Sequence, residues 1–314
     1  MKNASFKTLV EDVKISIRFA YKNIISYVLA IFGVLIISLI LLVFVAILIF
    51  VPLFFAMNGM EGFVAFFNSF DPTSGFDIAN LAVGAILIAT PLFAPFFVAI
   101  GALFGMGREI VESEGTSAEG VFTWYKKKFF SLAGGGIMLF VIVLGPLLIG
   151  FLIGMAIYGP SFFNFAFIGL GSTSPLSPFF SGLLLIWFAI SMGILSMMFP
   201  AIIDGYSVFE AVKKSVRMSI SYFDRVFGIW MSYLVILAAL IIPMVAIPYA
   251  TGVYWPLQVV LGIYAVPAML FLLFLYIPAI TIGLTRVYMI LTADDGYEES
   301  SQDDESGPSF IGGL

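Results

Sequence analysis

The chain lacks cysteine and histidine altogether, and only 11% of its 314 residues are charged. Without cysteine it has no disulfide, no thiol catalysis and no cysteine-ligated metal site. Without histidine it lacks the commonest general base and the commonest metal ligand. Soluble domains carry about 25% charged residues, so this chain has too little charge to cover the surface of a soluble globule.

Long apolar runs take the place of charge, and the mean hydropathy is +1.12. Six runs contain no Asp, Glu, Lys or Arg, and each can cross ~30 Å of hydrocarbon as a helix. The runs are solid rather than alternating, which favours helices over barrel strands. We therefore predict an all-α polytopic membrane protein with about six spans in one domain, 1–293. The runs are roughly Ile24–Met57, Ile78–Gly107, Phe129–Tyr158, Phe179–Ile203, Val226–Ala250 and Leu257–Thr285.

The 14 Lys and Arg residues all fall on one side of the predicted spans. Positive charge resists translocation, so this side is expected to be cytoplasmic. Six spans then place both termini in the cytoplasm, with the chain in the plasma membrane. The first run is too long for the apolar part of a cleavable signal peptide, so it is expected to be a true span.

Three basic stretches open with a hydroxyl residue three positions before a glutamate, which is the pattern of a helix capping box. The pairs are Thr8 with Glu11, Thr116 with Glu119, and Ser207 with Glu210. The segments 8–18 and 207–217 share five identical positions in eleven. We interpret this as a threefold repeat of an interfacial helix and two spans, at about 8–107, 116–203 and 207–292. The alternative is that capped basic helices simply recur between spans.

Each predicted interfacial helix has apolar residues at helical spacing and basic residues elsewhere, which is typical of an amphipathic helix on a membrane surface. The partners expected for these helices are membrane lipids, anionic at the cytoplasmic face. The candidate contacts are Lys14, Arg18, Lys22, Lys126, Lys127, Lys213, Lys214, Arg217 and Arg225.

The stretch Phe199–Arg217, continued by Phe223–Gly228, carries a recurring pattern: Pro200, Asp204, Ser207, Glu210-Ala-Val and Lys214-Ser-Val-Arg. It resembles a group of six-span membrane families that includes the non-catalytic membrane domain beside some glycerophosphoryl diester phosphodiesterases. The resemblance implies a six-helix domain without catalytic residues. The chain has no room for the soluble phosphodiesterase barrel, so the hydrolase activity is not carried over.

Catalytic groups are scarce in the sequence. No predicted span contains an aspartate, and Glu109, Glu112 and Glu114 are spaced like solvated charge rather than a metal site. No cofactor, metal or nucleic-acid partner is expected. Hydroxyls in the spans, such as Ser38 and Thr281, either line a path or hydrogen-bond between helices, and the second is commoner.

The leading hypothesis is a non-enzymatic protein that acts through lipids or partner proteins, as a scaffold or in membrane homeostasis. The alternative is a transporter or channel for a neutral or lipophilic solute, favoured by the many prolines in the spans. An enzyme is the third choice. The segment 294–314 holds seven acids and no base, so we predict a disordered cytoplasmic tail that is either idle or bound to a protein partner.

Overall fold

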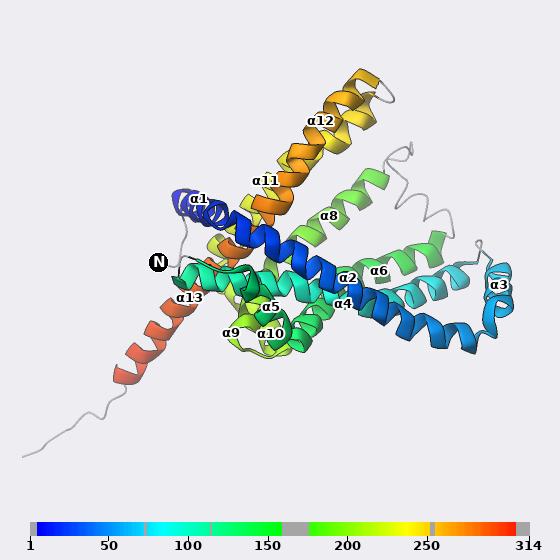
Figure 1. Ribbon diagram of the computed structural model, residues 1–314, viewed down its shortest axis with the longest axis horizontal. Helices are drawn as coiled ribbons and strands as arrows, with labels where there is room; N and C mark the ends of the chain where they lie inside the picture. The colour runs from blue at the N-terminus through cyan, green and yellow to red at the C-terminus, as the bar shows by residue number, and fades with distance from the viewer. Residues whose placement is uncertain (1–4, 72–73, 114, 159–175, 252–254, 306–314) are drawn as a thin grey trace, which may run out of the picture.

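The computed structural model describes residues 5–71, 74–113, 115–158, 176–251 and 255–305. Within these ranges the chain forms helices and no strand, so the all-α architecture is confirmed (Figure 1). In chain order the elements are α1 (Phe6–Lys22), α2 (Ile24–Ala56), α3 (Gly59–Ser69), α4 (Gly75–Ser113), α5 (Ala118–Lys127), α6 (Phe129–Tyr158), α8 (Leu176–Ile194), α9 (Met198–Asp204), α10 (Val208–Ser221), α11 (Phe223–Thr251), α12 (Trp255–Phe271), the π-helical turn η2 (Leu272–Tyr276) and α13 (Ile277–Glu305).

Six stretches of helix are long and apolar enough to cross a membrane, as predicted. The 33 residues of α2 extend about 50 Å, which exceeds the ~30 Å of hydrocarbon in a bilayer. The fourth span combines α8 with α9, and the sixth combines α12, η2 and α13. The spans are Ile24–Ala56, Ala79–Ser113, Phe129–Gly150, Gly182–Asp204, Phe223–Met244 and Val259–Ala293.

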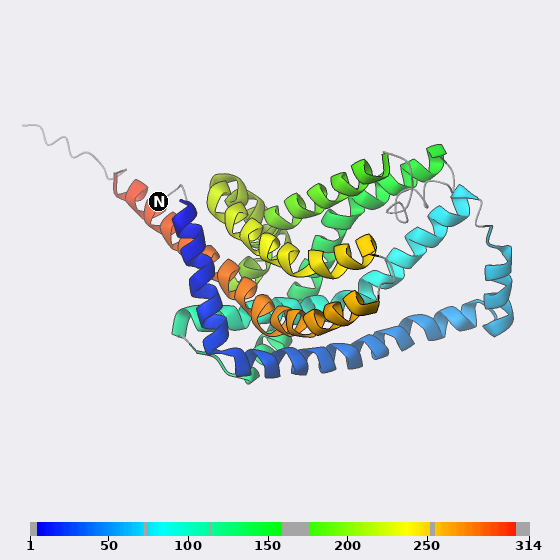
Figure 2. The ribbon, with the colours of Figure 1, turned by 90° about the horizontal axis from the view of Figure 1, so that it is seen from above.

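A short helix followed by two spans occurs three times in the described chain. The short helices are α1, α5 and α10, and they lie at one end of the molecule, together with the far end of α13 (Figures 1 and 2). The helix α3, which joins the first two spans, lies at the opposite end. We call the end with the short helices the inner end, and the end with α3 the outer end.

The helix starts agree with only one of the three predicted capping boxes. At α10, Ser207 and Glu210 form the predicted box, and these hydrogen bonds from Ser207 lower the pKa of the Glu210 carboxyl below its ordinary value. The other two predictions were wrong. The helix α1 begins three residues earlier than predicted, because Ser5 accepts the backbone N–H of Thr8. The helix α5 begins after Ser117, because the Thr116 hydroxyl donates to Glu109 instead.

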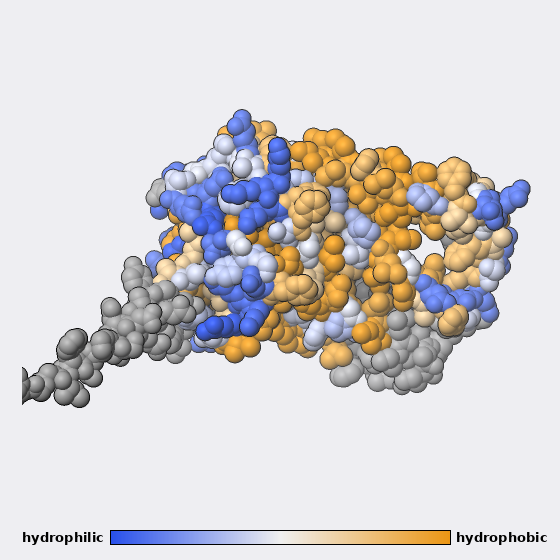
Figure 3. Space-filling view, turned by 90° about the horizontal axis from the view of Figure 1, so that it is seen from below, coloured by the Kyte–Doolittle hydropathy of each residue, from blue (hydrophilic) through white to orange (hydrophobic). Residues whose placement is uncertain are grey.

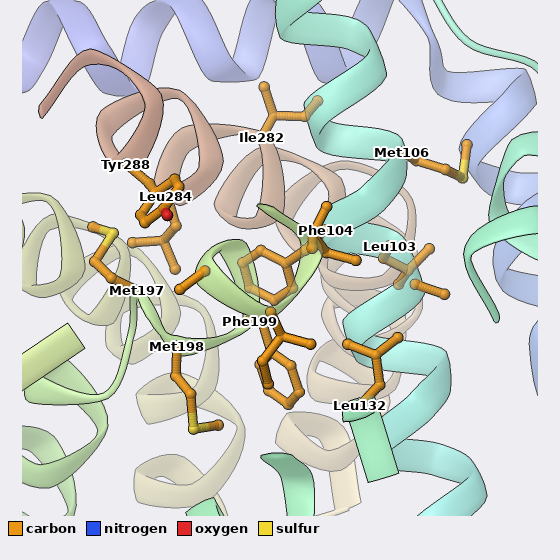
Figure 4. Packing of buried hydrophobic residues seen from close by; sticks show 14 of the residues in the cluster. Leu103, Phe104, Met106, Leu132, Met197, Met198, Phe199, Ile282, Leu284 and Tyr288 are labelled. Atoms are coloured by element: carbon orange, nitrogen blue, oxygen red, sulfur yellow. The ribbon is translucent and has the colours of Figure 1, made fainter. Parts of the chain in front are cut away.

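The buried core lies at the inner end. Fully buried residues from all six spans contribute to one cluster, among them Tyr27 of α2, Met106 of α4 and Ile229 of α11. Phe104 of α4 stacks on Phe199 of α9 with ring centroids 5.6 Å apart (Figure 4). These residues come from the first half of each odd-numbered span and the second half of each even-numbered span.

Glycines let the helices approach closely in this core. A Cβ added to Gly136 of α6 would lie 2.1 Å from Phe97 of α4, and one added to Gly105 of α4 would lie 2.3 Å from Trp124 of α5. At Gly107, the backbone of α13 itself is within 3.4 Å of the added atom. Small residues at helix crossings are the usual basis of packing in membranes, where lipid supplies no hydrophobic drive.

The outer halves of the spans are packed much less. A Cβ added to Gly84, Gly145, Gly182 or Gly262 would meet no described atom within 4 Å beyond its own helix backbone. Large apolar side chains such as Ile149 and Ile263 are exposed there. Figure 1 shows the hairpin of α11 and α12 diverging from α2 and α4. The bundle is therefore closed at its inner end and spread at its outer end.

The predicted acidic tail, 294–314, begins within the last described helix. The helix α13 continues to Glu305 and projects from the inner end of the bundle (Figure 1). Elongating an existing helix costs far less than nucleating one, so polar residues can extend a span into water. Residues 306–314 lie outside the described chain, as does most of the predicted outer loop 159–178.

Candidate functional site

Basic side chains gather at the inner end of the molecule, where Figure 3 shows a broad hydrophilic surface. They come from the three short helices, and most of them are exposed. We call these eight residues the basic rim. They are Lys14, Arg18 and Lys22 of α1, Lys126 and Lys127 of α5, and Lys213, Lys214 and Arg217 of α10.

Two members of the basic rim are oriented by aromatic rings. The Nζ of Lys214 donates to the Tyr206 hydroxyl at 2.8 Å and lies 4.1 Å from the centre of the Tyr206 ring and 5.3 Å from that of Tyr288. Lys127 lies 5.5 Å from the Trp124 ring. Such cation–π contacts hold an ammonium group at a fixed place without neutralising its charge.

The short helices present three sides rather than the two that were predicted. On α1 the side facing the bundle holds Asp12, Ser16 and Ala20, which are small or polar and buried. Apolar residues such as Phe6 and Phe209, at the start of α1 and α10, are exposed instead, at 82% and 74%. Part of the apolar surface therefore faces away from the protein, where a membrane would lie, while Leu9, Val13 and Ile17 pack against the core beside the small side.

Serines at equivalent positions of α1 and α10 join these helices to the bundle. The Ser16 hydroxyl hydrogen-bonds the hydroxyl of Tyr233 in α11, which donates to the Ala279 carbonyl of α13 at 2.7 Å. The Ser215 hydroxyl donates to the Ile194 carbonyl at 2.7 Å. Both serines are fully buried, so each hydrogen bond fixes the position of its helix against a span.

Asp12 is the centre of a buried ion cluster that the sequence reasoning missed. Its carboxylate accepts from Nη2 of Arg225 in α11 at 3.2 Å and from Nη1 of Arg286 in α13. Only 4% of the Asp12 side chain is exposed, against 12% for Arg225 and 22% for Arg286. We call these three residues the Asp12 cluster. Arg225 was predicted as a lipid contact of the same kind as the others, but its guanidinium is mostly buried and shares a carboxylate.

A second ion cluster joins three elements at the inner end. Arg108 of α4 donates to Asp204 at the end of α9 and to Glu112, each at 2.8 Å. The Tyr288 hydroxyl of α13 donates to the other Asp204 oxygen at 2.9 Å. Asp204 precedes the left-handed Gly205 that turns the chain into α10, so this cluster fixes the start of the third short helix.

Glu109 of α4 fixes the start of α5. Its carboxylate accepts from the Thr116 hydroxyl at 2.6 Å and from the Trp124 indole N–H at 2.8 Å. The prediction that Glu109 is solvated charge was therefore wrong, and Glu112 is paired with Arg108. Glu114 lies outside the described residues. Among the residues that the structure describes, no group of three or more acidic side chains is placed to hold a metal ion.

The buried hydroxyls of the spans bond to neighbouring backbone. Ser38 of α2 donates to the Pro95 carbonyl of α4 at 3.0 Å, while Thr281 donates to the Pro278 carbonyl within α13 at 2.8 Å. These contacts fit the structural interpretation of the hydroxyls better than a solute path. What the inner end offers chemically is positive charge at a membrane surface, suited to anions.

Comparison of the chain with models of protein families, with curated proteins and with solved structures gave no match.

Proposed function

We propose that this chain is a non-enzymatic integral membrane protein that acts through lipids, as a scaffold or in membrane homeostasis. The observation that carries the proposal is the uneven packing of the bundle. The inner end is locked by glycine crossings and ion clusters, and it presents the basic rim. The outer halves diverge and leave apolar side chains open to lipid.

The basic rim supplies the headgroup part of this function. Each Lys or Arg near an anionic membrane surface contributes about 1 kcal/mol of attraction. Exposed apolar residues of α1 and α10, such as Phe6 and Phe209, lie on the same helices as these basic residues, so both contributions act on one leaflet. The acidic segment that follows the sixth span is a candidate site for a protein partner.

We propose that the inner end is cytoplasmic and that the protein lies in the plasma membrane. A chain without cysteine allows a clean test, because a single introduced thiol is the only one present. Under the proposal, a membrane-impermeant maleimide labels Glu61→Cys, in α3, on intact cells. Ser117→Cys, before α5, is labelled only after permeabilisation. Labelling in the reverse pattern would contradict the orientation.

Lipid retention tests the proposed function itself. In a variant with the rim neutralised, the purified protein is expected to lose most of its co-purified anionic lipid, as seen by native mass spectrometry. The variant changes Lys14, Arg18, Lys126, Lys213 and Arg217 to Gln, all of which are exposed. The control variant combines Glu11→Gln with Glu119→Gln. It removes exposed acidic charges from the same short helices and should leave the amount of bound lipid unchanged. Equal lipid in the rim variant and the wild type would defeat the proposal.

A transporter for a neutral or lipophilic solute is the second candidate. The π-helical turn η2 favours it, because such turns often mark functional sites in helices. It lies where the sixth span passes from the packed core to the spread outer half, between Pro267 and Pro278. Substrate-dependent flux in liposomes would support this candidate, and lipid dependence without flux would support the first.

The threefold repeat remains a proposal, supported by burial at matching positions. The first, third and fifth spans each follow a residue that ends a short helix: Asn23, Lys128 and Tyr222. The residues four positions later are Tyr27, Leu132 and Val226, and all three are fully buried. The cap residues of α1 and α10, Asn23 and Tyr222, lie fifteen positions after the matched hydroxyl residues. The resemblance to non-catalytic phosphodiesterase-associated membrane domains is likewise a hypothesis, and it agrees with a protein that is not an enzyme.

A further inference from the structure

The Asp12 cluster contains more positive than negative charge. Two guanidinium groups share one carboxylate, and among the described residues Asp12 is the only acid within 4.0 Å of either arginine. Both carboxylate oxygens are already used, Oδ2 by Arg225 and Oδ1 by Arg286. A buried charge without a partner is costly, so a cluster with net charge +1 favours a second anion.

Unused hydrogen-bond donors show where that anion would bind. Nη1 of Arg225, and Nε and Nη2 of Arg286, donate to no described residue. Both side chains retain an exposed edge, 12% and 22%. Arg225 is also in the first turn of α11, where the backbone N–H groups add partial positive charge. The donors and the helix start therefore favour the same kind of ligand.

The level of the cluster in the membrane identifies the ligand class. Arg225 is two residues into the fifth span and Arg286 is near the end of the sixth, so both lie where lipid headgroups lie. A phosphate group matches the paired N–H donors of a guanidinium. We propose that the phosphate of an anionic phospholipid from the inner leaflet binds between Arg225 and Arg286 as the fourth member of the Asp12 cluster. This inference rests on the proposed lipid function and adds a specific site to it.

Asp12 then competes with the lipid for the same two arginines. Its removal should strengthen lipid binding, because both guanidiniums would be fully available to the phosphate. Removal of an arginine should weaken binding. A purely structural ion cluster predicts no gain in either variant, so the opposite signs distinguish the two roles.

The test compares lipid retention in the rim-neutralised protein with that in the same protein carrying Arg286→Gln, Arg286→Lys or Asp12→Asn. Native mass spectrometry counts bound phosphatidylglycerol, with phosphatidylcholine as the neutral probe. One tightly held phosphatidylglycerol is expected in the background protein, with about tenfold weaker binding in Arg286→Gln, as for one charged hydrogen-bond pair. Partial recovery is expected in Arg286→Lys and tighter binding in Asp12→Asn.

The result for Asp12→Asn keeps the test decisive if Arg286→Gln folds poorly, because misfolding cannot produce tighter binding. Unchanged phosphatidylglycerol binding in Asp12→Asn would overturn the inference. Equal binding of phosphatidylcholine would also overturn it. Thermal stabilisation by inorganic phosphate without retained lipid would assign the site to a free anion and overturn the lipid assignment. The proposed function fails separately, if the rim-neutralised background retains as much total anionic lipid as the unmodified protein.

Discussion

Asp12→Asn should lower the free energy of unfolding by about 3 kcal/mol in neutral detergent. The change preserves the shape of the side chain but removes the carboxylate between Arg225 and Arg286. Breaking a buried ion pair by removing one partner costs about 3–5 kcal/mol, because the remaining charge stays buried. We expect the lower part of this range, because both arginines keep an exposed edge.

The matched control for this experiment is Glu11→Gln, the neighbouring residue on α1. It removes the same charge from the same helix, but Glu11 is exposed, and surface changes usually stay within about 0.5 kcal/mol. Unfolding would be followed by circular dichroism during titration with a denaturing detergent. A similar small effect of both changes would mean that the Asp12 cluster does not hold α1 to α11 and α13. Addition of anionic lipid should recover more stability in Asp12→Asn than in Glu11→Gln.

The sequence predicted the spans well because their signal is local. A run of about 20 apolar residues without charge can only be a helix in lipid, whichever neighbours it packs against. The capping boxes were predicted less well, because Ser5 and Thr116 found other hydrogen bonds than those that the spacing indicated. The predicted order of short helix and two spans agrees with the described elements.

The ion clusters could not be predicted because their partners are far apart in the chain. Asp12 is 213 residues from Arg225 and 274 residues from Arg286. Only the packing of α1 against two spans brings them together. One local signal was available: Asp12, Ser16 and Ala20 recur at a spacing of four on a helix whose other sides are apolar or basic. That stripe of small and polar residues indicated a side that packs against protein.

Glycine motifs show the same limit. Gly101 and Gly105 have the four-residue spacing that permits close helix approach in membranes, and both lie against a neighbouring helix. Gly150 and Gly154 have the same spacing, but a Cβ added to Gly150 would meet no described atom within 4 Å. A small residue permits contact, whereas the divergence of the hairpins decides whether contact forms.

Gly136→Ala should destabilise the protein, whereas Gly145→Ala, in the same helix α6, should not. A Cβ at Gly136 would lie 2.1 Å from Cβ of Phe97, so α4 and α6 must move apart. Overpacking of this kind costs about 1–3 kcal/mol. At Gly145 there is open space, and replacing a helical glycine by alanine contributes about 0.5–1 kcal/mol of helix stability.

The same contrast repeats in α4, where Gly105→Ala meets the Trp124 ring and Gly84→Ala meets no described atom within 4 Å. Detergent-unfolding midpoints of the four variants would check both pairs. Equal losses at the inner and outer positions would mean that the spans are packed along their whole length. Losses confined to Gly136 and Gly105 would agree with a bundle held together at the basic end, whose outer halves can separate to admit acyl chains. Larger apolar residues at Gly145 would then also be tolerated, because lipid would yield to them where a neighbouring helix would not.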